Sequence, residues 1–339
     1  MKVTINDVAK IANVSPSTVS RVIAGNPRIS EETREKVLKI MKELNYYPNI
    51  IARSLANKST KIIGVIVPGT TEKAFQHPFL PEILRGIASA ASKNKYKILI
   101  SSATSIKEEK ETIDELANGA ITEGIILLTS RVKDPCIQEM MKLRFPFVVV
   151  GRPSQEDKIN WVDNNNSSIS YELTRHFLDQ GHKEIAFLGF SKEYMVTVDR
   201  LEGYKKALEE YNIKFDSKLV VEGEFIDDTG YSLAKKLFER GKKPSAIIAC
   251  DDLLAFGVIK YLNEKGIKVP QDIAVAGFNN VPLSDYFVPS LTSVEVNAFN
   301  LGYQAFQLLM NSISSNLTSI NRSIVSAELI IRESSLKTK

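Results

Sequence analysis

The sequence predicts a small all-α helix-turn-helix domain followed by an α/β body of two doubly wound lobes, each built on a parallel sheet. Three observations predict it. Two short amphipathic segments, separated by a tight turn, occupy the first 25 residues. Residues 1 to 60 contain ten Lys/Arg and five Asp/Glu, so they carry +5, whereas the rest of the +4 chain carries −1. From residue 61 onward, continuous apolar runs of strand length alternate with helical segments.

The first three helices are predicted from their caps and their apolar spacing. Thr4 precedes a stripe of apolar residues at three-and-four spacing, and its hydroxyl can accept a hydrogen bond from a free backbone N–H. After a two-residue turn, Ser15 caps the second helix, in which Pro16 takes the first position because no N–H donor is needed there. A third helix, capped by Ser30, closes the domain.

The exposed side of the second helix carries the residues that can reach DNA bases. At about 100° per residue, the side opposite the apolar stripe carries Ser17 and Arg21, with Thr18 on its flank. Arg21 is the strongest candidate because a guanidinium can donate two hydrogen bonds to guanine in the major groove. The alternative is that Arg21 contacts only phosphate or solvent. This face on a basic segment predicts a DNA-binding function.

The body alternates predicted strands and helices. Its continuous apolar runs are typical of strands buried on both faces of a parallel sheet. The predicted strands are 62–67, 97–100, 124–128, 147–150, 185–188, 219–221, 246–249 and 273–276. Helical segments fall between them, near 79–95, 107–118 and 134–144 in the first half. This rhythm predicts two doubly wound lobes.

Polar and aromatic residues follow several of these strands. Because ligands bind outside the carboxyl ends of strands in open α/β sheets, two facing lobes predict a cleft lined at those ends. Asp163, Asp251 and Asn279 can bond to hydroxyl groups, while Phe79 and Trp161 offer flat faces for a pyranose ring or a base. The set predicts a neutral polyhydroxylated ligand. The alternatives are caps or surface loops, and for Trp161 a lone aromatic that fills the seam between the lobes.

Composition and motifs exclude several other classes. No apolar run of signal-peptide length opens the chain and no stretch of about 18 apolar residues occurs, so we expect a cytoplasmic protein without membrane contact. Cys136 and Cys250 are far apart and lack metal-binding spacing, which is typical of buried thiols; neither a metal nor a cofactor is expected. The chain has no Gly-x-Ser-x-Gly elbow, phosphate-binding glycine loop or His-Glu-x-x-His motif, so no enzyme is indicated.

Motifs along the whole chain match one known family. They include Val-Thr-Ile-Asn-Asp-Val-Ala at 3–9, Val-Ser-Pro-Ser-Thr-Val-Ser-Arg-Val at 14–22, Asn-Tyr-Tyr-Pro-Asn at 45–49, Gly-Val-Ile-Val-Pro at 64–68, Asp-Arg-Leu-Glu-Gly at 199–203 and Asp-Asp-Leu-Leu-Ala-Phe-Gly at 251–257. The chain therefore resembles the lactose/purine repressor (LacI) family of bacterial transcription regulators. Within that family, segments 77–79, 147–153, 160–166 and 196–200 are most similar to maltose-operon repressors of Gram-positive bacteria.

The resemblance implies a homodimer that binds a pseudo-palindromic double-stranded DNA operator and has a periplasmic-binding-protein-like body with an effector cleft. The expected divisions are a head at 1–48, a hinge helix and linker at 49–60, a first lobe at 61–163 and 292–320, and a second lobe at 164–291 and 321–339. The expected DNA-facing residues are Thr4, Ser15, Ser17, Thr18, Arg21, Asn26, Tyr46, Asn49, Arg53 and Leu55. With Trp161 included, the expected effector-facing residues are Phe79, Trp161, Asp163, Arg200, Asp251 and Asn279.

One position departs from the family pattern. Sugar-binding relatives commonly carry Asp where this chain has Asn279, which leaves the hydrogen-bond polarity at this point open. The resemblance favours maltose or a maltodextrin as effector. The alternatives are a global carbon catabolite regulator that acts with a phosphoprotein corepressor, a solute-binding protein and a sugar-metabolising enzyme.

The expected hinge is short. Residues 49–57 make about two turns, fewer than the roughly 12–15 residues that an isolated helix needs in water. The segment is therefore expected to fold only against a dimer mate and DNA, with Leu55 wedged into the minor groove at a cost of a few kcal/mol of base unstacking. The alternative is a flexible linker with Leu55 exposed by chance.

Overall fold

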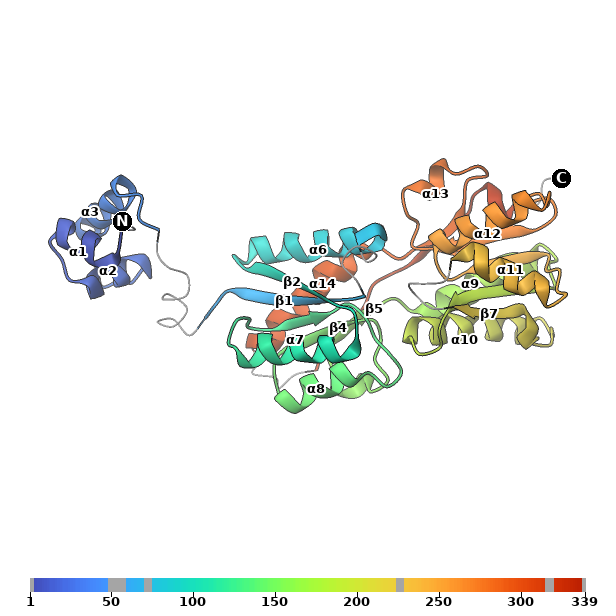
Figure 1. The fold of residues 1–339 in the computed structure, drawn as a ribbon, viewed down its shortest axis with the longest axis horizontal. Helices are drawn as coiled ribbons and strands as arrows, with labels where there is room; N and C mark the ends of the chain where they lie inside the picture. The colour runs from blue at the N-terminus through green and yellow to red at the C-terminus, as the bar shows by residue number, and fades with distance from the viewer. Residues whose placement is uncertain (1–2, 48–58, 70–74, 224–228, 315–319, 337–339) are drawn as a thin grey trace. The chain divides into compact units, whose positions relative to one another are not determined.

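The computed structural model describes residues 3–47, 59–69, 75–223, 229–314 and 320–336. The chain divides into two compact units, Met1–Lys61 and Ile62–Lys339, which are described separately below and drawn in Figure 1. None of the described helices is long and apolar enough to cross a membrane. Among the same residues, no group of His, Cys, Asp or Glu is placed to hold a metal ion.

The first unit contains the three predicted helices, α1 (Ile5–Ala12), α2 (Pro16–Ile23) and α3 (Glu31–Glu43). Their N-cap residues, Thr4, Ser15 and Ser30, are those that the sequence predicts. Asp7 accepts hydrogen bonds from both the amide and the hydroxyl of Thr4, at 2.8 and 2.7 Å. Ser15 Oγ accepts from the amide of Thr18 at 3.1 Å. Buried side chains from all three helices, including Val8, Val19 and Val37, form the core of this unit.

The first lobe of the body is built on an entirely parallel sheet with the strand order β11-β5-β4-β3-β1-β2. Its strands are β1 (Ile62–Pro68), β2 (Lys97–Ala103), β3 (Ile125–Leu127), β4 (Phe147–Val150), β5 (Trp161–Asp163) and β11 (Arg322–Ile324). Its helices are α6 (Phe79–Lys93), α7 (Ile106–Asn118), α8 (Pro135–Leu143) and α14 (Ala298–Ser314), with a short 3₁₀ helix at Glu156–Lys158. Helices α6 and α14 cover one face of the sheet, and α7 and α8 cover the other (Figure 1).

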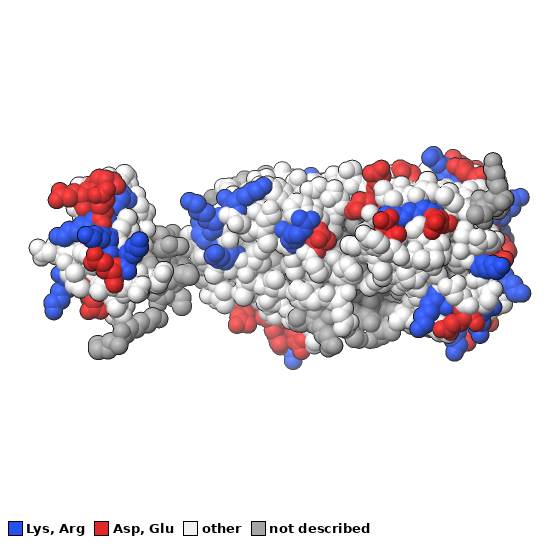
Figure 2. Space-filling model, turned by 90° about the horizontal axis from the view of Figure 1, so that it is seen from above, with Lys and Arg blue, Asp and Glu red and all other residues white. Residues whose placement is uncertain are grey.

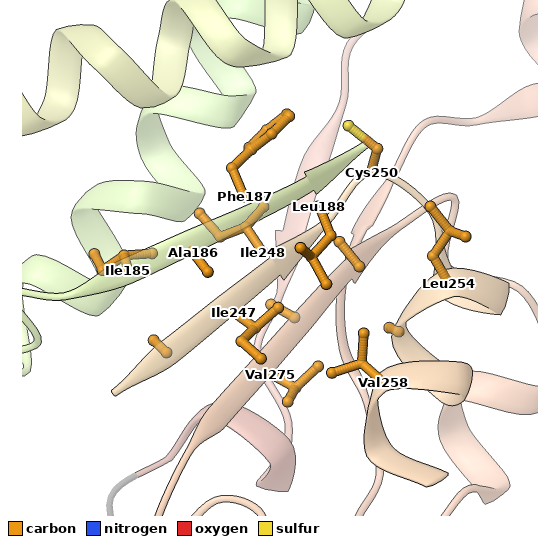
Figure 3. Close-up of a cluster of buried hydrophobic side chains, with 14 of the residues drawn as sticks. Ile185, Ala186, Phe187, Leu188, Ile247, Ile248, Cys250, Leu254, Val258 and Val275 are labelled. Atoms are coloured by element: carbon orange, nitrogen blue, oxygen red, sulfur yellow. The ribbon is translucent and has the colours of Figure 1, made fainter. Parts of the chain in front are cut away.

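The second lobe has the strand order β12-β10-β9-β8-β6-β7, parallel except for β12. Its strands are β6 (Ile185–Phe190), β7 (Val220–Gly223), β8 (Ala246–Ala249), β9 (Ala274–Phe278), β10 (Thr292–Glu295) and β12 (Glu328–Ile330). Its helices are α9 (Asn166–Asp179), α10 (Met195–Glu210), α11 (Gly230–Glu239), α12 (Asp252–Glu264) and α13 (Leu283–Tyr286), with 3₁₀ helices at Ser217–Leu219 and Glu333–Ser335. Figure 3 shows the apolar side chains of β6, β8, β9 and α12 packed together in its core.

The second and third crossings of the chain between the lobes lie further along the sequence than expected. The expected limits place residues 292–320 in the first lobe, but β10 pairs in parallel with β9, with Ser293 opposite Gly277, and so completes the second sheet. The limits also place residues after 320 in the second lobe, but β11 pairs with β5 of the first sheet. Both differences arise because partner choice between strands depends on hydrogen bonding across the sheet, which apolar periodicity does not reveal.

Candidate effector cleft and nucleic-acid interface

Helix α2 presents the expected reading face. Val19 and Val22 are buried against the other two helices, so the opposite side of α2 presents Ser17 and Arg21, both of which are exposed. Thr18 is half-buried on the flank. An exposed arginine on a helix held by a compact three-helix core is placed to enter a major groove without any change in the fold.

Several other DNA-facing candidates also have structural roles. Thr4 and Ser15 are caps, and Asn26 Oδ1 accepts from the amide of Arg28 at 2.9 Å, which shapes the loop between α2 and α3. Tyr46 packs against the core of the first unit. The remaining candidates, Asn49, Arg53 and Leu55, lie outside the described residues.

The carboxyl ends of the two sheets meet through polar contacts between the lobes. His77, just before α6, places Nε2 2.8 Å from Oδ2 of Asp251, which is two residues beyond the end of β8. Arg152, just after β4, donates through Nε to Asp199 on α10 at 2.9 Å and also through its terminal nitrogen. Phe79 contacts the cores of both lobes. The cleft predicted at the strand ends is therefore a junction of charged groups.

Arg200 follows Asp199 on α10 and is 6% exposed. Its Nε donates to Asn166 Oδ1 at 2.9 Å, one terminal nitrogen donates to the Cys250 carbonyl at 2.6 Å, and the guanidinium lies 4.0 Å from the centre of the Phe278 ring. Burial lowers the pKa of Arg200, whereas neighbouring carboxylates, including Asp163, act to raise it. Arginine remains protonated in proteins, so the cleft contains a fixed, oriented cation.

Asp163 is joined to Arg200 through Asn166. Asp163 Oδ1 accepts from Asn166 Nδ2 at 3.0 Å, and Oδ2 accepts from the amide of Arg152 at 2.8 Å. Burial raises the pKa of Asp163 to about 6, although hydrogen bonds from the backbone amides of Arg152 and Asn164 act to lower it. The buried carboxylate and the buried guanidinium are thus held at opposite ends of one amide, which orients both.

Asn279 also has a specific partner. Its Nδ2 donates to Asp251 Oδ2 at 2.6 Å, from a backbone in the left-handed region with φ of 93°. An aspartate at this position would place two carboxylates side by side, and like charges at this distance repel. The asparagine therefore acts as a donor within the cleft and leaves Asp251 as the acceptor.

Trp161 is the candidate that the structure does not bring to this set. Its side chain is 4% exposed and belongs to the core between the first sheet and helices α7 and α8, with Ile137, Met140 and Val149. The reason is that β5 is an inner strand of a parallel sheet whose two faces are both covered by helices. Trp161 does not fill the seam between the lobes; it is a core residue of the first lobe.

Four residues of this junction are not among the effector-facing residues that the family resemblance implies: His77, Arg152, Asn166 and Asp199. Arg152 and Asn166 do lie at strand ends, so their positions were a usable signal. For Asp199 the signal was its place beside Arg200. No pattern in the sequence shows that these groups pair across the two lobes. Arg152 and Asp199 are 47 residues apart in the chain, and His77 and Asp251 are 174 residues apart.

We expect the His77–Asp251 pair to stabilise the body in a pH-dependent way. Burial acts to lower the pKa of His77, but the carboxylates of Asp251 and Asp252 outweigh it, and the net shift is upward from the ordinary 6.5. A group with a raised pKa in the folded state stabilises it fully below about pH 6.5, and this contribution disappears as the pH rises through the raised value.

The corresponding measurement is thermal unfolding of wild type and His77→Gln from about pH 6 to about pH 9. The variant should be the less stable protein at the acidic end, and the difference should shrink toward the alkaline end. A difference that stays constant with pH would show that the pair contributes no ionic stabilisation.

Comparisons with known proteins agree with this architecture. A model described as "Bacterial regulatory proteins, lacI family" matches residues 4–49, and one described as "Periplasmic binding protein-like domain" matches residues 174–335. The transcriptional regulator MalR of Streptococcus pneumoniae is 38% identical over 334 residues, which cover 97% of this chain and 98% of MalR.

Two solved structures extend the comparison. The complex of the transcriptional regulator CelR with cellobiose is similar with a TM-score of 0.78 and 30% identity, covering 98% of this chain and 100% of CelR. The lac repressor dimer bound to operator and an anti-inducer is similar with a TM-score of 0.85 and 25% identity, covering 99% of this chain and 100% of that one. The similarity thus extends over both units of the chain.

Proposed function

Because this chain belongs to the lacI family of bacterial regulatory proteins, we propose that its operator affinity is controlled by maltose or a maltodextrin bound between its two lobes. The chain is a DNA-binding transcriptional repressor and not an enzyme. The observation that carries the choice of sugar is the 38% identity to a protein named MalR over almost the full length of both chains. The cellobiose complex of CelR supports a sugar as the ligand class.

The chemistry of the cleft supports a neutral sugar. Arg200 is a rigid donor, and guanidinium groups can donate to two adjacent hydroxyls at once. Asp251 is an acceptor that now holds His77 and Asn279, and a sugar hydroxyl could take the place of either donor. Because Asp251 joins the lobes through His77, a ligand on Asp251 would alter the contact between them.

The test is a calorimetric titration of the full-length protein with maltose, maltotriose, glucose and cellobiose, alongside binding to a candidate operator. We expect saturable binding of maltose or maltotriose and a change in operator affinity without any added protein. If operator affinity changes only with a phosphorylated partner protein, the chain is a catabolite regulator of the same family. If cellobiose or glucose binds and the maltosaccharides do not, the proposed sugar class is wrong.

We also propose that the segment at 49–57 forms a helix on the operator and that Leu55 enters the minor groove there. Leu55→Ala should then weaken operator binding about 10- to 100-fold and affect non-specific duplex much less, because a shorter side chain cannot hold an unstacked base step open. Anisotropy titrations with operator and scrambled duplex measure the two affinities.

Leu55→Met, which keeps an apolar side chain of similar length, serves as the control and should retain most of the operator affinity. Equal losses of Leu55→Ala on both duplexes would instead indicate that the segment is a plain linker.

A further inference from the structure

The strands of the two lobes begin at opposite ends of the body. Their carboxyl ends meet at the junction formed by His77, Arg152, Asp199 and Asp251, so their amino ends point away from each other (Figure 1). The linker from the head enters the body at Ile62, the first residue of β1. The amino end of the first sheet, called the linker edge below, is therefore the part of the body nearest along the chain to the DNA-binding head.

The backbone turns that precede the strands differ between the two lobes. In the second lobe, left-handed residues stand before β6, β7, β8 and β9, and all are glycine or asparagine: Gly181, Asn212, Gly241 and Gly266. These are the residues that adopt this backbone most readily. In the first lobe, the left-handed positions before β1, β2, β3 and β4 carry Lys61, Lys95, Ala120 and Arg144, with φ of 54°, 59°, 51° and 51°. Three cations thus occupy sterically unfavourable positions at the linker edge.

Lys95 is part of a group of exposed lysines. Lys93 ends α6 and Lys97 begins β2, so the three lysines, here called the lysine patch, surround one turn. Figure 2 shows Lys and Arg side chains (blue) gathered at this end of the first lobe, apart from the Asp and Glu side chains (red) of that lobe. Within the described part of the chain, none of the three forms an ion pair; Lys93 Nζ lies 5.1 Å from the centre of the Tyr303 ring.

We propose that the lysine patch binds the phosphate backbone of duplex DNA beside the centre of the operator. The proposal rests on the contact of Leu55 with the duplex. Lys97 lies opposite Ile62 in the sheet, and Leu55 and Ile62 are seven positions apart, a distance of at most about 25 Å when the chain is extended. Adjacent strands are about 4.8 Å apart, so the patch stays within reach of phosphates next to the hinge site.

This contact supplies affinity without sequence preference. Each lysine that neutralises a phosphate releases a condensed counterion, so the logarithm of the binding constant falls more steeply with the logarithm of salt concentration. The body, and not only the head, thereby adds to the electrostatic attraction for DNA.

The test measures the salt dependence of binding of full-length protein to operator and to scrambled duplex, from about 50 to 200 mM salt. The variant is Lys93→Gln/Lys95→Gly/Lys97→Gln, in which glycine suits the left-handed turn and keeps the fold. The slope should become shallower by about 0.9 for each lost phosphate contact, or up to about 2.7 in total. The affinity for the operator should fall with the slope, because Leu55 holds the first lobe beside the duplex there, and the change on scrambled duplex should be smaller.

A matched control separates local contact from net charge. Lys183→Gln/Lys214→Gln/Lys243→Gln removes three exposed lysines from the amino end of the second sheet and should leave the slope unchanged. Equal slopes for the patch variant and wild type, or equal changes in patch variant and control, would overturn the proposal. Leu55→Ala in the same titration tests the hinge separately, because its loss should be confined to the operator.

Discussion

Replacing Arg200 by alanine is expected to abolish the response to sugar while operator binding stays within about threefold of wild type. The guanidinium is the fixed cation of the cleft, and charge-assisted hydrogen bonds are each worth about 1.5–3 kcal/mol. Loss of two such bonds to a ligand would reduce its affinity at least about 100-fold. The DNA-binding head is a separate compact unit, so its reading face does not depend on this side chain.

The variant also changes the protein itself. Without Arg200, Asn166 and the Cys250 carbonyl lose a donor and the buried Asp163 loses a nearby cation. Removing one partner from a buried ionic network commonly costs about 3–5 kcal/mol, so stability must be measured first. Arg200→Lys serves as a second variant, because it keeps the charge but not the fork of parallel donors.

Sugar affinity is measured by calorimetry, and induction by operator anisotropy with and without sugar. Arg200→Lys should fold and bind the operator, yet bind sugar weakly. Induction by Arg200→Ala at normal sugar affinity would remove this residue from the effector site.

Arg21→Ala is expected to reduce discrimination between the operator and a duplex altered at one base pair. A bidentate contact between arginine and guanine contributes about 1–3 kcal/mol, which corresponds to about a 5- to 150-fold change in preference. Because Arg21 is exposed and Val22 provides the neighbouring core contact, the fold should be unaffected. Footprinting and anisotropy with single-base operator variants locate the base pair whose identity no longer matters.

Arg28→Ala is the matched control, since Arg28 is also exposed but lies in the loop after α2. Its removal should weaken operator and scrambled duplex by similar factors. If Arg21→Ala behaves in the same way as this control, Arg21 contacts phosphate and another residue, such as Ser17, reads the sequence.

Local patterns in the sequence were sufficient to predict the helix starts in the head and the buried strands of the body, because these depend on residues that are close together in the chain. The caps at Thr4, Ser15 and Ser30 located the starts of three helices, because a capping side chain acts within three residues. Most predicted strands were confirmed, since a strand covered on both faces must be apolar throughout. The same reasoning failed for Trp161, because Trp161 begins the unpredicted strand β5 and therefore lies inside the sheet rather than beyond its carboxyl end.

The sequence by itself therefore determined the three helices of the head, eight strands of the body and the exposed face of α2, all of which follow from periodicity and capping over a few residues, but it did not predict β5, β10, β11 and β12. Only the tertiary structure decided that β10 and β11 complete different sheets, that Trp161 is a core residue and that Arg152 and His77 contact the opposite lobe. These features depend on which distant segments exchange hydrogen bonds and charges, and residues separated by tens to hundreds of positions leave no periodic signal of their contact.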